Sequence, residues 1–89
     1  MAQAIADPEE LDGFANELAA YRDALGSETA RIQGRFASLG DSWQDEKRRA
    51  FEDQFDELVG QISRFEESCD DCIPFLHSLA ERLRDYLQS

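Results

Sequence analysis

The sequence predicts an all-α protein, an antiparallel two-helix hairpin that dimerises into a four-helix bundle. Two long amphipathic segments flank one short stretch, Leu39 to Glu46, which holds the only tryptophan. Both segments repeat their apolar residues at helical spacing over several heptads. We therefore expect one domain over residues 1–89, with helices at about 8–40 and 43–87 and a turn at about 40–43.

The first predicted helix opens with Asp7-Pro8-Glu9-Glu10. Asp7 can cap the helix, Pro8 suits its first position, and the two glutamates complement the helix dipole. The apolar residues that follow keep one helical stripe: Leu11, Phe14, Leu18, Tyr21, Leu25, Ile32, Phe36 and Leu39. Gly40 then stands where a helix end favours a residue that tolerates positive φ.

The second predicted helix opens directly after this turn. Ser42 and Asp45 resemble a capping box in which aspartate replaces glutamate. Steps of four and three alternate through Phe51, Phe55, Leu58, Ile62, Phe65, Cys69, Cys72, Leu76, Leu79, Leu83 and Tyr86, a regularity typical of coiled coils. Pro74 lies outside this series, so we expect a kink there and not a helix end.

The apolar surface of both segments is wider than one neighbouring helix can cover. Ile73, Phe75 and Ala80 widen the second stripe, and small chains commonly cover such a surplus by oligomerising. We predict a homodimer, or a heterodimer with a related helical hairpin. Its predicted interface residues are Leu11, Phe14, Leu18, Tyr21, Leu25, Phe51, Phe55, Leu58, Ile62, Phe65, Ile73, Phe75, Leu76 and Leu79.

Composition restricts the function classes. The net charge of −11 argues against nucleic acid as a partner, because phosphates would be repelled. The single basic run, Lys47-Arg48-Arg49, lies between acidic residues and is interpreted as a solvated, locally neutralised surface. No apolar run approaches the ~20 residues of a membrane span, and the N-terminus lacks a signal-peptide pattern. We expect a cytoplasmic protein or one secreted by a signal-peptide-independent route.

The two cysteines, Cys69 and Cys72, are the only candidates for metal or redox chemistry. Both fall on the apolar series, which favours small buried thiols. Two alternatives stay open: a four-thiolate metal site shared across a dimer, and a redox-active or intermolecular disulfide. His77 has no companion nucleophile at a recognisable spacing. We expect neither a cofactor nor an enzymatic activity.

The order of the motifs resembles that of the WXG100 (ESAT-6-like) family, small bacterial helical-hairpin proteins associated with type VII secretion. The matching pieces are Asp7-Pro8-Glu9-Glu10-Leu11 with Phe14-Ala15 and Leu18, Leu39-Gly40, Ser42-Trp43, and Ala50-Phe51 with Phe55. The resemblance implies an antiparallel four-helix bundle that is exported folded or acts as a partner for export. It also implies secretion machinery or an effector as further partners.

Two positions depart from the family pattern. Asp45 replaces the glycine that usually stands two residues after the tryptophan, and the sequence ends before an acid could follow Tyr86 by four residues, as the family's export signal requires. One hypothesis is therefore a WXG100-like secretion substrate or accessory protein recognised at Trp43, Gln44 and Asp45. The alternative is a cytosolic adaptor or chaperone-like module for a larger effector. Trp43 is either a lid on the bundle end or a contact for a partner.

Overall fold

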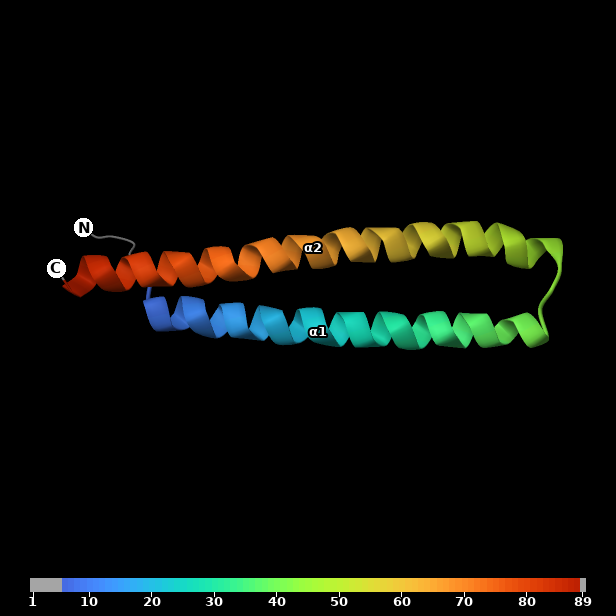
Figure 1. Ribbon diagram of the computed structural model, residues 1–89, viewed down its shortest axis with the longest axis horizontal. Coiled ribbons are helices and arrows are strands. Elements are labelled where there is room, and N and C mark those ends of the chain that lie inside the picture. The colour runs from blue at the N-terminus through green and yellow to red at the C-terminus, as the bar shows by residue number, and fades with distance from the viewer. Residues whose placement is uncertain (1–5, 89) are drawn as a thin grey trace.

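Two antiparallel α-helices joined by a short turn form the fold, which confirms the predicted helical hairpin. The computed structural model describes residues 6–88. Helix α1 spans Pro8–Ser38, the 3-10 turn η1 spans Leu39–Asp41, and helix α2 spans Glu46–Gln88 (Figure 1). Most of the N-terminal stretch without a signal-peptide pattern lies outside the described residues.

The molecule is a thin rod. It measures 66 × 18 × 17 Å and has a radius of gyration of 20.0 Å, whereas a compact chain of this length would have about 12 Å. Its accessible surface of 6672 Å² exceeds the roughly 5,300 Å² expected for a compact protein of this mass. The lone hairpin therefore leaves much more surface in water than a globular fold would.

The start of α1 follows the sequence pattern. Asp7 has extended backbone angles, and its side chain accepts a hydrogen bond of 2.9 Å from the Glu9 backbone N–H. Pro8 is the first helical residue, where its missing N–H costs no helical hydrogen bond. Asp7 is therefore the N-cap, as predicted.

The end of α1 differs from the prediction. The helix ends at Ser38 and tightens into η1, and within residues 6–88 no glycine has positive φ. The Leu39 carbonyl accepts from the N–H groups of Ser42 at 3.0 Å and Trp43 at 2.7 Å, which keeps the turn right-handed. A Cβ at Gly40 would lie 2.6 Å from Nη1 of Arg48, so a side chain there would require the Arg48 guanidinium to move.

The start of α2 also requires a correction. The helix begins at Glu46, not near residue 43, and Asp45, not Ser42, is the capping residue. The Asp45 carboxylate accepts a hydrogen bond of 3.1 Å from the Arg48 backbone N–H. The Ser42 hydroxyl instead donates back to the Leu39 carbonyl at 3.5 Å. From Glu46, α2 continues through Pro74 to Gln88, so the proline does not end the helix; the kink remains a prediction.

The apolar series on α2 divides between two directions. One heptad set lies against α1 and is half-buried or buried: Phe55, Ile62, Cys69, Leu76 and Leu83. The other set is mostly exposed: Phe51, Leu58, Phe65, Cys72 and Tyr86. On α1, Phe14 and Tyr21 are likewise exposed, and the Tyr21 ring meets the Phe65 ring edge-on at 6.1 Å. This contact places both exposed sets on one side of the hairpin.

We call that side the open face and define it by Phe14, Tyr21, Phe51, Leu58, Phe65, Cys72 and Tyr86. Between the helices, the fully buried hydrophobic residues of the described chain are Ala15, Cys69 and Ala80. Small side chains let two helices approach closely, but they bury little apolar area. The contact between α1 and α2 therefore sets the geometry of the hairpin without burying its large apolar side chains.

Ion pairs connect the two helices along the other edge of the seam. Arg22 reaches Asp70 at 2.9 Å and Glu66 at 3.6 Å. Nearer the termini, Asp12 accepts from His77 at 2.7 Å and from Arg84. These pairs join residues 44 to 72 positions apart in the chain, so they help to fix the register of α1 against α2.

The ion pairs predict how stability depends on pH. Hydrogen bonds from His77 and Arg84 lower the pKa of Asp12, and a hydrogen bond from Arg22 lowers the pKa of Asp70. A carboxyl group whose pKa is lower in the folded state stabilises the fold above its unfolded pKa, close to 3.8 here, and loses that contribution as the pH falls through the folded value.

We expect Asp12→Asn and Asp70→Asn to destabilise the hairpin at pH 7, and this destabilisation to shrink as the pH falls below about 3.8. Urea unfolding followed by circular dichroism between pH 2.5 and 7 measures both effects (a chosen range spanning the ordinary Asp pKa of about 3.9). Asp71→Asn, at the exposed neighbouring position, is the control. An equal loss in all three variants at pH 7 would contradict the prediction.

Candidate protein-interaction surfaces

The bend at the end of the rod brings together the three residues predicted for recognition. The Trp43 indole N–H donates to the Asp45 carboxylate at 2.9 Å, and the indole lies against the Phe51 ring with centroids 6.0 Å apart. The Gln44 side-chain amide donates to the Gly40 carbonyl at 2.8 Å. Trp43 is half-buried, while Gln44 and Asp45 are exposed. The bend therefore has one defined local conformation.

Asp45 has two roles in that conformation. The same carboxylate oxygen that accepts from the Trp43 indole also accepts from the Arg48 backbone N–H. One side chain thus caps α2 and orients the tryptophan. A glycine at this position, as in the usual motif of the family that the sequence resembles, would supply neither contact.

Arg48 is the central residue of the bend, although the sequence pattern suggested a solvated position. Its guanidinium donates to the Trp43 carbonyl at 3.3 Å and lies 4.8 Å from the centre of the Phe36 ring. Its Nε atom is buried and has no hydrogen-bond partner among the described residues. Lys47 and Arg49 are exposed, so the solvated interpretation is wrong for Arg48 alone.

Three phenylalanines form an aromatic cluster beneath the bend. The Phe36 ring centre lies 4.9 Å from that of Phe55 and 5.6 Å from that of Phe51, and Phe51 and Phe55 stack at 6.0 Å. Offset and edge-on contacts at these distances favour aromatic packing. Trp43 extends the cluster to the end of the rod. Trp43 closes this end of the rod and is also partly accessible. Both interpretations of Trp43, a lid on the bundle end and a contact for a partner, therefore stay open.

Beside the bend lies a polar hollow of about 340 Å³, lined by Gln44, Asp45, Arg48, Arg49 and Glu52. Its lining carries both signs of charge and an amide. Such a surface suits polar contacts of a partner at the end of the rod better than an apolar docking contact.

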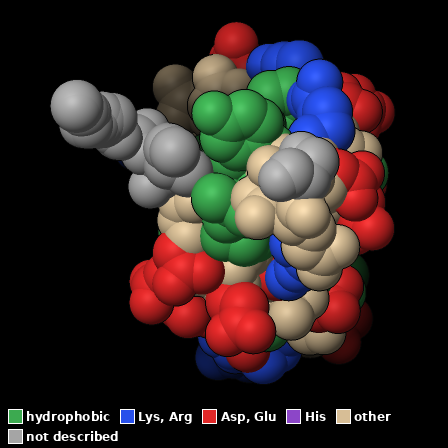
Figure 2. Space-filling view, turned by 90° about the vertical axis from the view of Figure 1, so that its left-hand side faces the viewer, with side chains coloured by type: hydrophobic (Ala, Val, Ile, Leu, Met, Phe, Trp, Pro, Cys, Tyr) green, Lys and Arg blue, Asp and Glu red, His purple; other side chains and the backbone are tan. Residues whose placement is uncertain are grey.

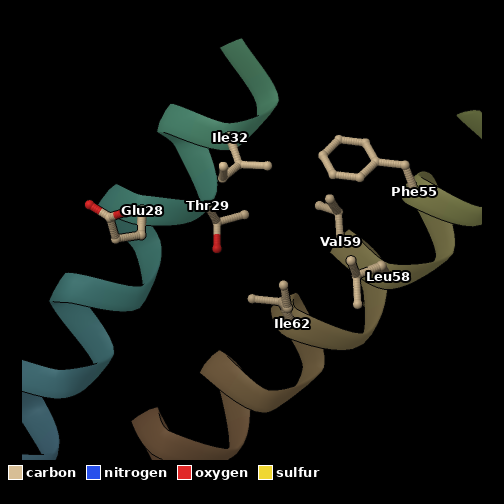
Figure 3. A pocket seen from close by; sticks show the side chains of 7 residues that line it. All are labelled: Glu28, Thr29, Ile32, Phe55, Leu58, Val59 and Ile62. Carbon is tan, nitrogen blue, oxygen red and sulfur yellow. The ribbon is translucent and has the colours of Figure 1, made fainter. Parts of the chain in front are cut away.

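A second hollow, of about 220 Å³, lies between α1 and α2 and is almost entirely apolar. It is lined by Glu28, Thr29, Ile32, Phe55, Leu58, Val59 and Ile62, and Figure 3 shows the apolar side chains pointing into the space between the helices while the Glu28 carboxylate points away. The sequence explains it: the apolar series of α1 passes from Leu25 directly to Ile32, so no large side chain fills the seam there.

The predicted interface residues separate into two groups. Those that contact the seam are half-buried within the hairpin itself: Leu11, Leu18, Leu25, Phe55, Ile62, Ile73, Leu76 and Leu79. Those left exposed are Phe14, Tyr21, Phe51, Leu58, Phe65 and Phe75. At the end that carries the termini, hydrophobic side chains also reach the surface, with both basic and acidic side chains around them (Figure 2). The sequence alone did not separate the two groups.

The cysteines occupy different environments. Cys69 is buried against α1, as expected, but Cys72 is exposed, so the prediction that both thiols fill the core is wrong for Cys72. They lie three residues apart, and α2 turns the second away from the seam. In residues 6–88, no group of three or more potential metal ligands comes together. His77 is paired with Asp12, a contact that the sequence did not indicate.

The described residues contain no helix long and apolar enough to span a bilayer. They define a class of small helical-hairpin proteins with one uncovered apolar face and an ordered tryptophan bend. Residues 3–86 match the model of the WXG100 family, described as proteins of 100 residues with WXG. The chain belongs to the WXG100 family.

Solved structures share the fold. A secreted protein EsxB from Bacillus anthracis str. Sterne is 21% identical, with a TM-score of 0.81 over 97% of this chain and 98% of that chain. The E54Q mutant of EsxB is 22% identical, with a TM-score of 0.81 over 97% of this chain and 96% of that chain. No curated protein matches the sequence. At this identity, the structural likeness establishes the hairpin fold alone.

Proposed function

We propose that this chain is a non-catalytic binding protein of type VII secretion, acting as a secretion substrate or as an accessory partner for export. The observation that carries the proposal is the open face of a WXG100 hairpin, on which Phe14, Tyr21, Leu58 and Phe65 are between 46% and 57% exposed. Large apolar patches bordered by polar residues are typical of interaction sites. A second hairpin on this face would complete a four-helix bundle.

The bend is the proposed recognition element at the end of that bundle. Trp43 offers an aromatic surface, and the exposed Gln44 and Asp45 flank it beside the polar hollow. EsxB is described as a secreted protein, which supports export of this chain. We therefore propose that secretion machinery or a partner contacts Trp43, Gln44 and Asp45.

Trp43→Ala tests this role. We expect reduced export from the bacterium that encodes the protein, with the helical fold retained. Trp43→Phe keeps an aromatic ring but loses the donor to Asp45, so it separates the ring surface from the indole N–H. Quantitative immunodetection inside and outside intact cells is the measurement. Export of the alanine variant at the wild-type level would exclude a role for the bend.

A second function is favoured by one observation at the same place. Because the Asp45 carboxylate already accepts the indole N–H, the most directional donor of Trp43 is used within the chain. This favours a structural tryptophan and a cytosolic adaptor or chaperone-like module for a larger effector. The same assay distinguishes the two functions, since an adaptor would stay inside intact cells and would co-purify with its effector.

A further inference from the structure

The contacts between α1 and α2 are grouped towards the two ends of the rod. Nearer the chain termini lies one group, residues 8–24 and 64–88, which we call the terminal unit. Among the described residues it contains every ion pair between the two helices, those of Asp12 and Arg22 with partners on α2. It also contains the fully buried hydrophobic residues, which are Ala15, Cys69 and Ala80. Water-exposed ion pairs and small buried side chains each contribute little to stability.

The other group surrounds the turn, and we call residues 35–55 the bend unit. It contains the three phenylalanines of the aromatic cluster together with Trp43 and Arg48. Aromatic pairs at these distances contribute stability beyond the area that they bury. The two units are separate, because in the described part of the chain no α1 side chain between Arg22 and Phe36 forms an ion pair or a ring contact with α2.

The apolar hollow lies between the two units. Its lining falls at positions 28–32 of α1 and 55–62 of α2, and the Glu28 carboxylate points away from it (Figure 3). From α1 only Thr29 and Ile32 therefore reach the seam at this level, and Ile32 is 41% exposed. Side chains that border an unfilled space lose the van der Waals contacts that a filled core would give them. The packing of α1 against α2 is therefore weakest at the hollow.

Glycines weaken the helical backbone at the same level. Gly26 and Gly34 stand on either side of the hollow on α1, and Gly60 lies within the stretch of α2 that lines it. A Cβ at Gly34 would meet no atom within 4 Å, and one at Gly60 would meet only Nη1 of Arg64, at 3.7 Å. Close packing therefore requires neither glycine. Glycine in a helix interior makes local opening about fivefold more frequent than alanine does.

We propose that the hollow and its glycines form a hinge, at which the terminal unit opens while the bend unit stays closed. The direction follows from chain entropy. The contact between Phe36 and Phe51 joins residues 15 positions apart, whereas the pair of Asp12 and Arg84 joins residues 72 positions apart. Closing the longer loop costs more entropy, and the contacts that close it are the weaker ones. The terminal unit is therefore the part of the hairpin that separates first.

The hinge has one consequence at each end of the rod. The hydrogen bond from the Trp43 indole to Asp45 lies wholly within the bend unit, so the bend keeps its conformation while the terminal unit is open. Recognition at the bend then does not require a closed terminal unit. At the other end, Cys69 is 3% exposed in the closed hairpin and reaches water only on opening. Its thiol is a native reporter of the hinge.

Native-state hydrogen exchange of the full chain, resolved along the sequence, tests the hinge. We expect helical amides of the terminal unit to exchange about tenfold or more faster than those of the bend unit, with a step at the hollow. Fraying of helix ends alone would give a gradual change without a step. Asp12→Asn should speed exchange in the terminal unit and leave the bend unit unchanged, because its ion pairs lie on one side of the hinge. Asp71→Asn, at an exposed position of the same unit, is the control.

Filling the hollow should stiffen the hinge. Thr29→Leu adds apolar volume to the lining, so we expect exchange in the terminal unit to slow roughly fivefold and the step to shrink. The matched control is Ser27→Leu, which adds the same side chain at an exposed position outside the lining. Gly34→Ala should likewise slow exchange around the hollow about fivefold, because there is room for its Cβ.

The second test uses the buried thiol. In a Cys72→Ser background, a small alkylating reagent modifies Cys69 only when the terminal unit opens. Asp12→Asn should speed this alkylation without changing the emission of Trp43, the only tryptophan. A parallel shift of the Trp43 emission would show that both units open together.

Three results would overturn the inference. Equal acceleration of exchange in both units by Asp12→Asn would show that the hairpin opens as a whole. Faster exchange in the bend unit would reverse the direction of opening. Equal effects of Thr29→Leu and Ser27→Leu would show that the hollow is not the hinge. Each of these results concerns motion within one chain, so the export assay and the proposed function would be unaffected.

Discussion

Phe65→Asp is expected to weaken the pairing of the hairpin by about a hundredfold or more. Phe65 is 46% exposed near the middle of the open face and contacts Tyr21 of the other helix. The substitution removes an apolar ring from the interface and leaves a carboxylate without a cationic partner, and together these effects cost about 3 kcal/mol or more. Light scattering across a dilution series measures the change for whichever hairpin proves to be the partner.

The control is Ser78→Asp, which adds the same charge to an exposed position of α2 outside the apolar series. Both variants change the net charge equally, so a difference between them isolates the open face. Phe65→Asp should also leave the isolated hairpin folded, because half of its side chain is already in water. Pairing that is unaffected by Phe65→Asp would show that the partner binds elsewhere.

The second large effect is expected at the bend. Arg48→Ala should lower the free energy of unfolding by about 1–3 kcal/mol, because it removes the hydrogen bond to the Trp43 carbonyl and the packing over Phe36. Urea unfolding measures this loss. The emission of Trp43, the only tryptophan, should shift to longer wavelength as the bend opens.

Arg49→Ala is the matched control because it removes the same side chain from the exposed neighbouring position. A surface substitution of this kind usually changes stability by no more than about 0.5 kcal/mol. If the two variants lost equal stability and left the same emission spectrum, Arg48 would be a solvated residue after all.

The apolar spacing predicted the two helices and their antiparallel arrangement because both depend on local patterns. The heptad series on α2 keeps one period from Phe51 to Tyr86, and the turn residues separate it from the series on α1. The series did not reveal which of its two rows faces α1. That depends on how far each helix rotates about its axis, which is set by the close approach at Ala15, Cys69 and Ala80.

The details of the bend were less predictable, because two residues could cap α2. Ser42 and Asp45 both have capping side chains, and the sequence favoured the earlier one. The N–H groups of Ser42 and Trp43 donate to the Leu39 carbonyl, so both residues remain part of the turn. The backbone therefore becomes helical again only after Asp45. The start of α2 is therefore decided by competition between the hydrogen bonds of the turn and those of the helix cap. Propensity rules consider each of these segments separately and do not describe that competition.

Arg48 was missed although the sequence contains a signal for it. It precedes Phe55 by seven residues and therefore stands on the inward row of α2 with Phe55, Ile62 and Cys69. Its position between acidic residues suggested a solvated charge, but the long side chain packs its stem and guanidinium over Phe36. The position of Arg48 in the heptad was therefore more informative than the charges of its neighbours in the sequence.

The slender shape of the hairpin also affects how the protein behaves in hydrodynamic experiments. A radius of gyration of 20.0 Å belongs to a compact chain of roughly 330 residues, not to one of 89. A single copy will therefore diffuse more slowly and elute earlier from a sizing column than a compact protein of the same mass. Elution volume alone would mistake the monomer for an assembly, and scattered intensity, which reports mass independently of shape, is needed to count the chains.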